Sequence, residues 1–244
     1  YNCEHSIFKS IGYTLRNVYA RWTKAYLRNV DMFACITEFQ KKKLIEAGYD
    51  KNKITVIPNS IDAPCSYTPT SGEYIAYIGR LSYEKGYDLL VEVARKHPEI
   101  KFRFAGAQRE QKNTDIPSNV EFAGYLQKDK LLEFIQKARF IVIPSRCYEG
   151  FPMAILEAAC HGKPAIAPNH GGFTEIIGQG ENAIGKLFEP GNTDDLDKQI
   201  AELWNNQTLT EELGEKAFRK LKKHYDSEVV YKQWETLFSK LKNS

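Results

Sequence analysis

The chain alternates short apolar runs with amphipathic stretches from Tyr74 onward, and this alternation determines the predicted fold. The apolar runs are rich in β-branched and aromatic residues, which is typical of buried strands. The stretches between them have helical spacing, as where Leu89, Leu90, Val93 and Ala94 fall on one face. The predicted strands are Tyr74–Ile78, Lys101–Gly106, Val120–Gly124, Phe140–Pro144, Pro164–Pro168 and Ile184–Pro190.

The stretches between these runs are predicted to be helices, which makes the fold class α/β. They cover residues 130–137 and 152–161, and two longer segments that begin at Thr193 and Thr208. Single strands separated by helices form βαβ units, so we expect a Rossmann-like parallel sheet with helices on both faces. A ligand of such a sheet lies at the carboxyl ends of its strands, so the residues after each apolar run are the site candidates.

The first part of the chain has too few elements for a core of its own. We predict a basic, aromatic-rich helix, a strand, a second helix and a strand that runs into a proline-rich linker. An isolated small sheet is marginally stable, so we expect these elements to be part of a second Rossmann-like domain. Their ranges are, in order, Tyr13–Arg28, Met32–Thr37, Phe39–Ala47, Ile54–Pro58 and Pro58–Pro64.

These patterns divide the chain into three segments. Residues 1–62 are predicted to be the C-terminal remnant of a further domain, with its hinge, and residues 63–225 to be the Rossmann-like domain. A final helix over Ser227–Leu241 follows a break near residues 224–226. We expect this last segment, residues 226–244, to cross back to the first domain.

The composition excludes several classes of protein. With 244 residues, 42% of them hydrophobic, the chain is long enough for one large or two ordinary globular domains. It has no apolar run of membrane-spanning length, and its basic, aromatic beginning is not a signal peptide. A formal charge of +3 with interspersed signs does not indicate nucleic acid as a partner. Five scattered cysteines without a close pair indicate reduced thiols in the cytoplasm and no zinc site.

The first predicted strand is followed by a glycine and two cations. Gly79 lets a ligand approach the backbone, and Arg80 and Lys85 lie five positions apart at a loop-to-helix junction. Arginine binds phosphate oxygens in a bidentate manner and lysine supplies a point charge, so the pair predicts a phosphate site. The alternative is two solvated surface cations. Gly124–Leu126 and Gly171–Gly172 also follow strands, and alone they are consistent with simple turns.

Two carboxylates, Glu149 and Glu157, lie eight positions apart after the fourth predicted strand. Eight residues are slightly more than two helical turns, so both side chains point to about the same side if a helix joins them. Between them, Gly150–Ala154 places N–H groups at a helix N-terminus, with Pro152 tolerated in the first turn, and such an end binds anions. The alternative is a solvated glutamate near an unrelated helical one.

Two tempting motifs are discounted. Gly178 and Gly180 resemble part of a dinucleotide fingerprint, but they precede a predicted strand and do not follow one. Asp195 and Asp197 resemble a carboxylate pair that holds a metal on a sugar nucleotide. They lie in the first turn of a helix for which Thr193 is the predicted cap, where the helix dipole favours acidic residues.

Four segments in this order resemble the C-terminal domain of glycosyltransferase family 4: GRLSYEKG, PSRCYEGFPMAILEA, GGFTEII and GKLFEPGN. The resemblance extends over Asp31–Trp204, and the cation loop together with the E-x7-E segment is its most specific part. The stretch from ITEF to PNSID resembles the hinge of that family. The resemblance implies the GT-B architecture, in which two Rossmann-like domains face each other across a cleft.

The resemblance also implies the roles of the site residues. Arg80 and Lys85 hold the donor diphosphate, Glu149 contacts hydroxyls of the donor sugar, and these three are the expected catalytic residues. Glu157 contacts the ribose hydroxyls, and Gly124–Leu126 lie near the base. The transfer is expected to be retaining, with no cofactor and no metal. The other residues expected at the donor are Gly79, Gly124, Tyr125, Leu126, Gly150, Phe151, Pro152, Met153, Ala154, Gly171 and Gly172.

The sequence departs from the family at its beginning. The domain that carries the acceptor site is represented only by its last elements, so we expect a piece of a longer protein that does not transfer sugar alone. His5 lies too near the hinge to match a catalytic histidine. The expected partners are a nucleotide-sugar donor and, through the absent domain, a glycan or lipid-linked acceptor of cell-surface polysaccharide synthesis. The helix over Tyr13–Arg28 is interpreted as a solvated domain face or, alternatively, as a peripheral contact with the inner face of the membrane.

Two other functions use the same donor site. A GT-B-fold sugar-nucleotide epimerase needs acid and base groups from both domains, and the E-x7-E spacing favours transfer. A non-catalytic relative only binds a nucleotide sugar or a partner, and the presence of both cations and both glutamates argues against it. The base, the sugar, the acceptor, the linkage and the oligomeric state are left open by the sequence.

Overall fold

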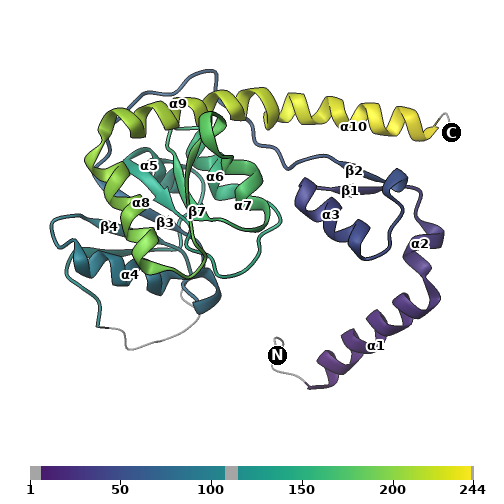
Figure 1. The fold of residues 1–244 in the computed structure, drawn as a ribbon. Coiled ribbons are helices and arrows are strands. Elements are labelled where there is room, and N and C mark those ends of the chain that lie inside the picture. The colour runs from purple at the N-terminus through teal and green to yellow at the C-terminus, as the bar shows by residue number, and fades with distance from the viewer. Residues whose placement is uncertain (1–6, 108–114, 243–244) are drawn as a thin grey trace.

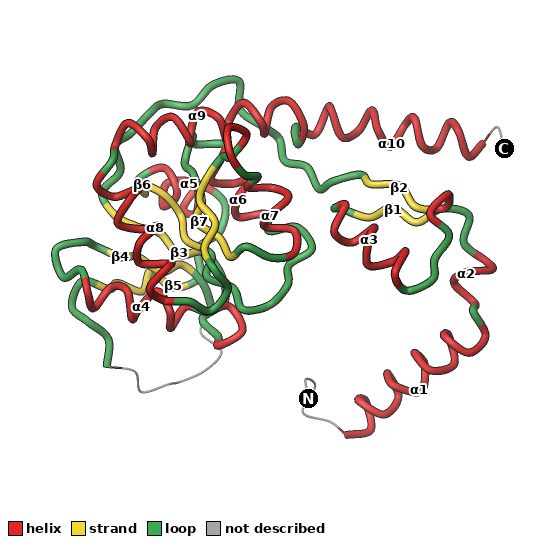
Figure 2. Tube along the Cα trace, viewed as in Figure 1, coloured by secondary structure: helices red, strands yellow, loops and turns green. Residues whose placement is uncertain are grey.

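The computed structural model describes residues 7–107 and 115–242, which form two parallel sheets (Figures 1 and 2). Cys3 and His5 lie outside the described residues. The larger sheet has the strand order β5-β4-β3-β6-β7-β8. Its strands are β3 Tyr74–Ile78, β4 Phe102–Ala105, β5 Val120–Gly124, β6 Ala138–Val142, β7 Ala165–Pro168 and β8 Gly185–Phe188.

The strand order shows that the larger sheet is doubly wound. The chain builds outward from β3 through β4 to β5, then returns to the other side of β3 and continues through β6, β7 and β8. All neighbouring strands are parallel. The order therefore reverses between β3 and β6, and doubly wound sheets bind their ligands at such a reversal. The predicted α/β fold class is confirmed.

Helices cover both faces of the larger sheet because its strands are apolar on both sides. In β3, Tyr74 and Ala76 pack with residues of α5, α6, α7 and α9, whereas Ile75 and Tyr77 pack with residues of α4 and α8. The helices are α4 Tyr87–Lys96, α5 Asp129–Gln136, α6 Met153–Ala159, α7 Gly171–Ile177, α8 Thr193–Asn205 and α9 Gln207–His224. The 3-10 helices of the described residues are η1 Lys51–Lys53, η2 Tyr83–Lys85 and η3 Gly180–Asn182.

The N-terminal part forms the smaller sheet, in which β1 pairs in parallel with β2 and α3 connects them. The one continuous helix predicted over residues 13–28 is wrong, because the helix breaks at Lys24. The φ of Lys24 is 51°, in the left-handed region that a helix does not use. The elements are α1 Ile7–Thr23, α2 Ala25–Asn29, β1 Phe33–Cys35, α3 Glu38–Glu46 and β2 Ile54–Val56.

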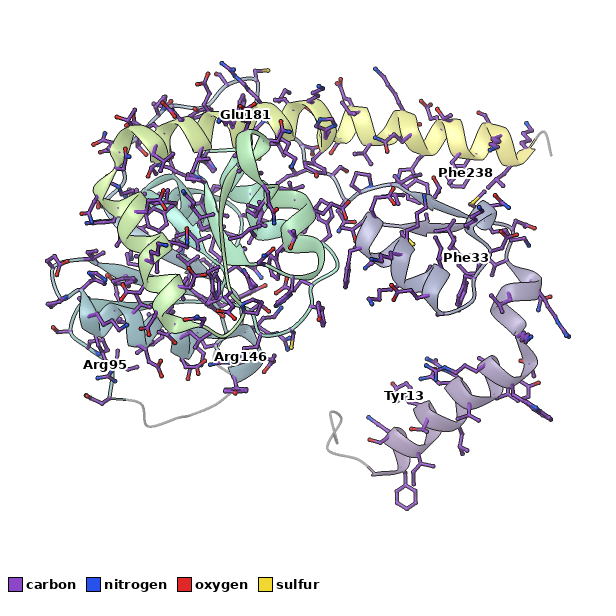
Figure 3. All side chains as sticks on the ribbon, viewed as in Figure 1. Tyr13, Phe33, Arg95, Arg146, Glu181 and Phe238 are labelled. Carbon is purple, nitrogen blue, oxygen red and sulfur yellow. The ribbon has the colours of Figure 1, made fainter. Side chains whose placement is uncertain are left out.

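The two connections between the sheets lie side by side. Ile61, in the linker after β2, donates its N–H to the carbonyl of Tyr225 (3.0 Å) and accepts from the N–H of Ser227 (3.1 Å). From this joint α10, Ser227–Lys242, leaves the larger sheet and runs along the smaller one (Figure 1). Phe238 of α10 points toward the smaller sheet in Figure 3. Within the described part of the chain, no helix is both long and apolar enough to cross a membrane.

The helix that begins at Thr193 is confirmed as α8, but two details at predicted helix starts differ from the structure. Pro152 precedes α6 as its N-cap and is not in the first turn. The cap of α8 is Asn192 and not Thr193, because the Asn192 Oδ1 accepts from the N–H groups of Asp194 (3.1 Å) and Asp195 (3.0 Å). An Asn oxygen reaches the first free amides of a helix as well as a Thr hydroxyl does, so sequence alone does not separate the two.

Candidate functional site

The loop after β3 is pressed against the end of β6. Gly86, which follows η2, has a φ of +68°, and a Cβ at this position would lie 1.8 Å from the carbonyl oxygen of Pro144. Only glycine fits this position, since other residues add a clash to an unfavourable backbone conformation. Lys85 is the residue just before Gly86, so the close approach of the two loops also sets the place of its side chain.

Arg146 joins the two loops by its side chain. Its guanidinium nitrogens donate to both carboxylate oxygens of Asp88, at 2.6 and 2.8 Å, and its Cζ lies 4.1 Å from the ring centroid of Tyr83. Its backbone N–H donates to the carbonyl of Glu84 (3.0 Å). Arg146 lies on the side of the larger sheet opposite α9 and α10 (Figure 3). Arg146 is among the residues after the fourth predicted strand, but the sequence interpretation assigned it no role.

Lys85 and Glu149 form an ion pair at the point where the strand order reverses. Lys85 Nζ donates to Glu149 Oε1 at 2.8 Å, and the side chains are 24% and 20% exposed. Lys85 comes from the loop after β3 and Glu149 from the loop after β6, the two neighbouring strands of the reversal. Two residues predicted separately for the site are thus brought into direct contact.

A cavity of about 640 Å³ opens at the carboxyl ends of β3, β4 and β5. Arg80 and Glu157 line it together with Tyr125 and Leu126. Burial raises the pKa of the Glu157 carboxyl, because the charged carboxylate loses contact with water. A ligand that donates hydrogen bonds to this carboxylate would stabilise its charged form. The volume is in the range of small-molecule sites, and the lining combines two cations, Arg80 and Lys128, and one carboxylate, Glu157, with apolar side chains.

Glu149 and Glu157 occupy different parts of the site. Because α6 begins at Met153, no helix joins the two residues, and the condition for their pointing to one side is not met. Glu149 lies in the loop and pairs with Lys85, whereas Glu157 lies in the second turn of α6 and lines the cavity. Among the residues between them, Phe151 and Pro152 are buried and Met153 and Ala154 are half-buried.

Gly171 and Gly172, at the start of α7, make their close approach to the Glu149 loop. Gly172 N–H donates to the carbonyl of Glu149 (3.0 Å), and a Cβ at Gly172 would lie 2.3 Å from the carbonyl oxygen of Gly150. Gly171 has a φ of +59°. These glycines therefore admit a neighbouring backbone segment and hold the Glu149 loop in place, and the approach of a ligand to them stays a prediction.

The first turn of α3, from the smaller sheet, contacts the same loop. The ring of Phe39 stacks on Tyr148, with centroids 5.6 Å apart and an interplanar angle of 20°. A Cβ at Gly150 would lie 2.2 Å from Gln40 Nε2, so this glycine makes room for the glutamine. The sequence interpretation missed Phe39 and Gln40, because residues so distant along the chain have no local signal for their contact.

The discounted motifs do not form sites. Asp195 Oδ2 accepts from the N–H of Glu189 (2.7 Å), whereas Asp197 Oδ1 lies 2.6 Å from His97 Nε2, so the two carboxylates point to different partners. In the described residues, no group of three or more His, Cys, Asp and Glu side chains is arranged to hold a metal ion. Gly178 and Gly180 lie between α7 and β8, where a dinucleotide fingerprint is not found.

Comparisons with known proteins agree over most of the chain. Residues 66–220 match the glycosyl transferases group 1, and residues 3–63 match Glycosyltransferase Family 4. An uncharacterized glycosyltransferase of Methanocaldococcus jannaschii is 32% identical over 193 residues, which are 77% of this chain and 53% of that protein. An exopolysaccharide phosphotransferase of Streptomyces coelicolor is 30% identical over 228 residues, 87% of this chain and 24% of that protein. The chain spans about half the length, or less, of the curated relatives it matches first.

Solved structures show the same fold. Anabaena HepE in complex with UDP superposes with a TM-score of 0.78 at 19% identity, and the match covers 88% of this chain and 65% of that one. The complex of HepE with UDP-glucose gives a TM-score of 0.76 at 20% identity, with the same shares covered. At this identity the likeness concerns the fold, which is GT-B-like.

Proposed function

This chain belongs to the glycosyl transferases group 1 family, and on that premise we propose that it carries the donor site of a retaining glycosyltransferase. Members of the family use nucleotide-sugar donors without a bound metal. The observation that supports the proposal most is the Lys85–Glu149 pair at the reversal between β3 and β6. A doubly wound sheet binds its ligand there, and a nucleotide sugar needs both a cation and a hydrogen-bond acceptor.

Each part of the donor is proposed to lie against a different part of the site. Arg80 and Lys85 hold the diphosphate, with Lys85 in the 3-10 helix and Arg80 in the lining of the 640 Å³ cavity. The nucleoside fills this cavity, so that Tyr125 meets the base and Glu157 accepts hydrogen bonds from the ribose diol. Glu149 accepts hydrogen bonds from hydroxyls of the sugar.

In the proposed transfer, a hydroxyl oxygen of the acceptor attacks the anomeric carbon from the face on which the diphosphate departs. The bond from this carbon to the acceptor oxygen forms while the bond to the phosphate oxygen breaks, so the configuration is retained. The proton of the acceptor hydroxyl passes to the departing diphosphate. Arg80 and Lys85 stabilise the negative charge that develops on the diphosphate, which is the largest contribution that such a site makes.

We propose that residues 1–62 belong to the acceptor-binding domain with its hinge, residues 63–225 to the donor domain, and residues 226–244 to a helix that packs on the first domain. The hydrogen bonds of Ile61 with Tyr225 and Ser227 and the course of α10 along the smaller sheet support this division (Figure 1).

The proposed acceptor is a glycan or a lipid-linked molecule of polysaccharide synthesis, in line with the exopolysaccharide relative. The proposed location is the cytoplasm. For α1, the exposed Phe8 and Trp22 make a peripheral lipid contact the alternative to a solvated domain face.

A thermal melt of this chain against UDP-, GDP-, ADP- and dTDP-sugars tests the proposal. One nucleotide class is expected to raise the melting temperature, since a ligand at a hundred times its Kd stabilises the folded state by about 2.7 kcal/mol. The variant Glu157→Ala is the matched control and is expected to lose most of the shift. If none of the sugars changes the melting temperature, the chain does not carry a donor site.

A further inference from the structure

Glu175 of α7 caps a helix that belongs to the other sheet. Its Oε1 accepts from the N–H of Glu38 (3.0 Å) and its Oε2 from the N–H of Phe39 (3.1 Å), the first two residues of α3. The third amide, of Gln40, donates to the Thr37 hydroxyl (3.3 Å). The first amides of a helix have no partner inside it, and a carboxylate is favourable there. The contact therefore joins the two sheets through charge-assisted hydrogen bonds.

The two helices that Glu175 joins both contact the Glu149 loop. From α7, Gly172 donates its N–H to the carbonyl of Glu149 (3.0 Å). From α3, Phe39 stacks on Tyr148, and Gln40 occupies the space that a side chain at residue 150 would need. The loop is thus held between α3 and α7, and Glu175 keeps these helices together.

We propose that Glu175 is a positioning residue for the donor site, through which contact between the two sheets determines where Glu149 lies. This inference rests on the proposed function, because it assigns Glu149 to the donor sugar. A carboxylate is suited to the task, since it accepts from two amides at once. The loop has backbone contact with α7 and side-chain contact with α3, so a loss of the cap loosens it from the α3 side.

Amide hydrogen exchange without any ligand tests this positioning directly. In Glu175→Gln, which keeps the size but loses one acceptor and the charge, exchange at Glu38, Phe39 and Gly172 is expected to rise about tenfold. The control is Asn206→Ala, which removes a cap of similar kind from α9, where Asn206 Oδ1 accepts from the Leu209 N–H (3.0 Å). This end of α9 adjoins α8, and α8 lies far from α3 in Figure 1. The control variant is expected to leave those three amides unchanged. If Glu175→Gln raises the exchange rates of the Glu38 and Phe39 amides but not that of the Gly172 amide, Glu175 only caps α3 and the inference is wrong.

A second readout uses UDP and UDP-glucose in titration calorimetry. Glu175→Gln is expected to weaken UDP-glucose about tenfold while UDP changes little, because only the sugar depends on Glu149. Phe39→Ala leaves the cap intact and is also expected to weaken the binding of UDP-glucose more than that of UDP. It replaces Glu175→Gln in this experiment if Glu175→Gln does not fold. An equal loss of affinity for UDP and for UDP-glucose overturns the inference. If the unaltered chain binds no nucleotide sugar, the proposed function fails instead, and the exchange experiment still decides the role of Glu175.

Discussion

Lys85 Nζ lies 2.8 Å from Glu149 Oε1, so the cation proposed for the donor diphosphate and the carboxylate proposed for the donor sugar neutralise each other. Both side chains are mostly buried, where an unpaired charge is costly. The pair therefore fixes both side chains at the place proposed for the donor. A nucleotide sugar offers phosphate oxygens to the lysine and hydroxyls to the glutamate, so its binding adds partners to both.

The ion pair predicts that removing one partner affects the other. Lys85→Met leaves Glu149 as an unpaired negative charge beside the diphosphate site, and we expect UDP to bind about ten- to a hundredfold more weakly. The double variant Lys85→Met/Glu149→Gln removes the repulsion and is expected to recover part of this loss. Calorimetry with UDP measures both. A double variant that binds UDP as weakly as Lys85→Met indicates that the two side chains do not interact in solution.

Gly86 is predicted to be the position where the site tolerates a side chain least. In Gly86→Ala the new Cβ meets the Pro144 carbonyl oxygen at 1.8 Å with φ at +68°, and we expect a loss of about 3 kcal/mol or more in the free energy of unfolding. Gly180→Ala is the matched control, because its φ is +61° and nothing lies within 4 Å of the added Cβ. It should lose only about 1–2 kcal/mol, the cost of the backbone conformation. Urea denaturation measures the free energy of unfolding of both variants. Equal losses in the two variants contradict the clash at residue 86.

The fold was predictable because its signals are local, and the place of the candidate site is a prediction from the same signals. Apolar runs at strand spacing gave the six strands of the larger sheet, and the rule that ligands lie at strand ends selected Lys85 and Glu149. Their contact with each other spans 64 positions and depends on side-chain conformations, so no pattern along the chain contained it. The same holds for the Arg146–Asp88 pair and for Glu175 at α3. The break at Lys24 was also missed, since Lys has no preference that signals a left-handed residue.

Nucleotide-sugar binding is predicted to be independent of divalent metal. Two cations face the diphosphate in the proposed site, and the carboxylates of Asp195 and Asp197 are engaged with Glu189 and His97. A chelator should therefore leave the Kd for UDP-glucose unchanged, and added magnesium should not lower it. As a control, Asp195→Asn should bind UDP-glucose like the unaltered chain. If chelation abolishes binding and magnesium restores it, the discounted carboxylates must be reconsidered.

Lys163 is predicted to make stability depend on pH above neutrality. Its side chain is 3% exposed and donates to the carbonyl and the hydroxyl of Thr70, and burial lowers the pKa of its ammonium group from 10.5 to about 8. Between these values the folded state binds fewer protons than the unfolded state, so this residue makes the free energy of unfolding rise with pH. Between pH about 8 and about 10.5, the free energy of unfolding of the unaltered chain should rise by up to about 3 kcal/mol relative to that of Lys163→Met. Urea denaturation at both pH values measures it, and a difference that does not change with pH refutes the prediction.

The two glutamates are predicted to serve different parts of the donor. Glu157 lines the 640 Å³ cavity that is proposed for the nucleoside, so Glu157→Ala should weaken the binding of UDP and UDP-glucose equally, by about 1.5–3 kcal/mol or roughly ten- to more than a hundredfold. Glu149 contacts Lys85 and, by proposal, only the sugar. Glu149→Ala should therefore weaken UDP-glucose and leave UDP unchanged or slightly tighter, since the lysine loses its competing carboxylate. Calorimetry of both variants with both ligands separates the roles. If Glu149→Ala weakens UDP as much as Glu157→Ala does, Glu149 acts on the diphosphate or on the fold of the loop, and the assignment to the sugar is wrong.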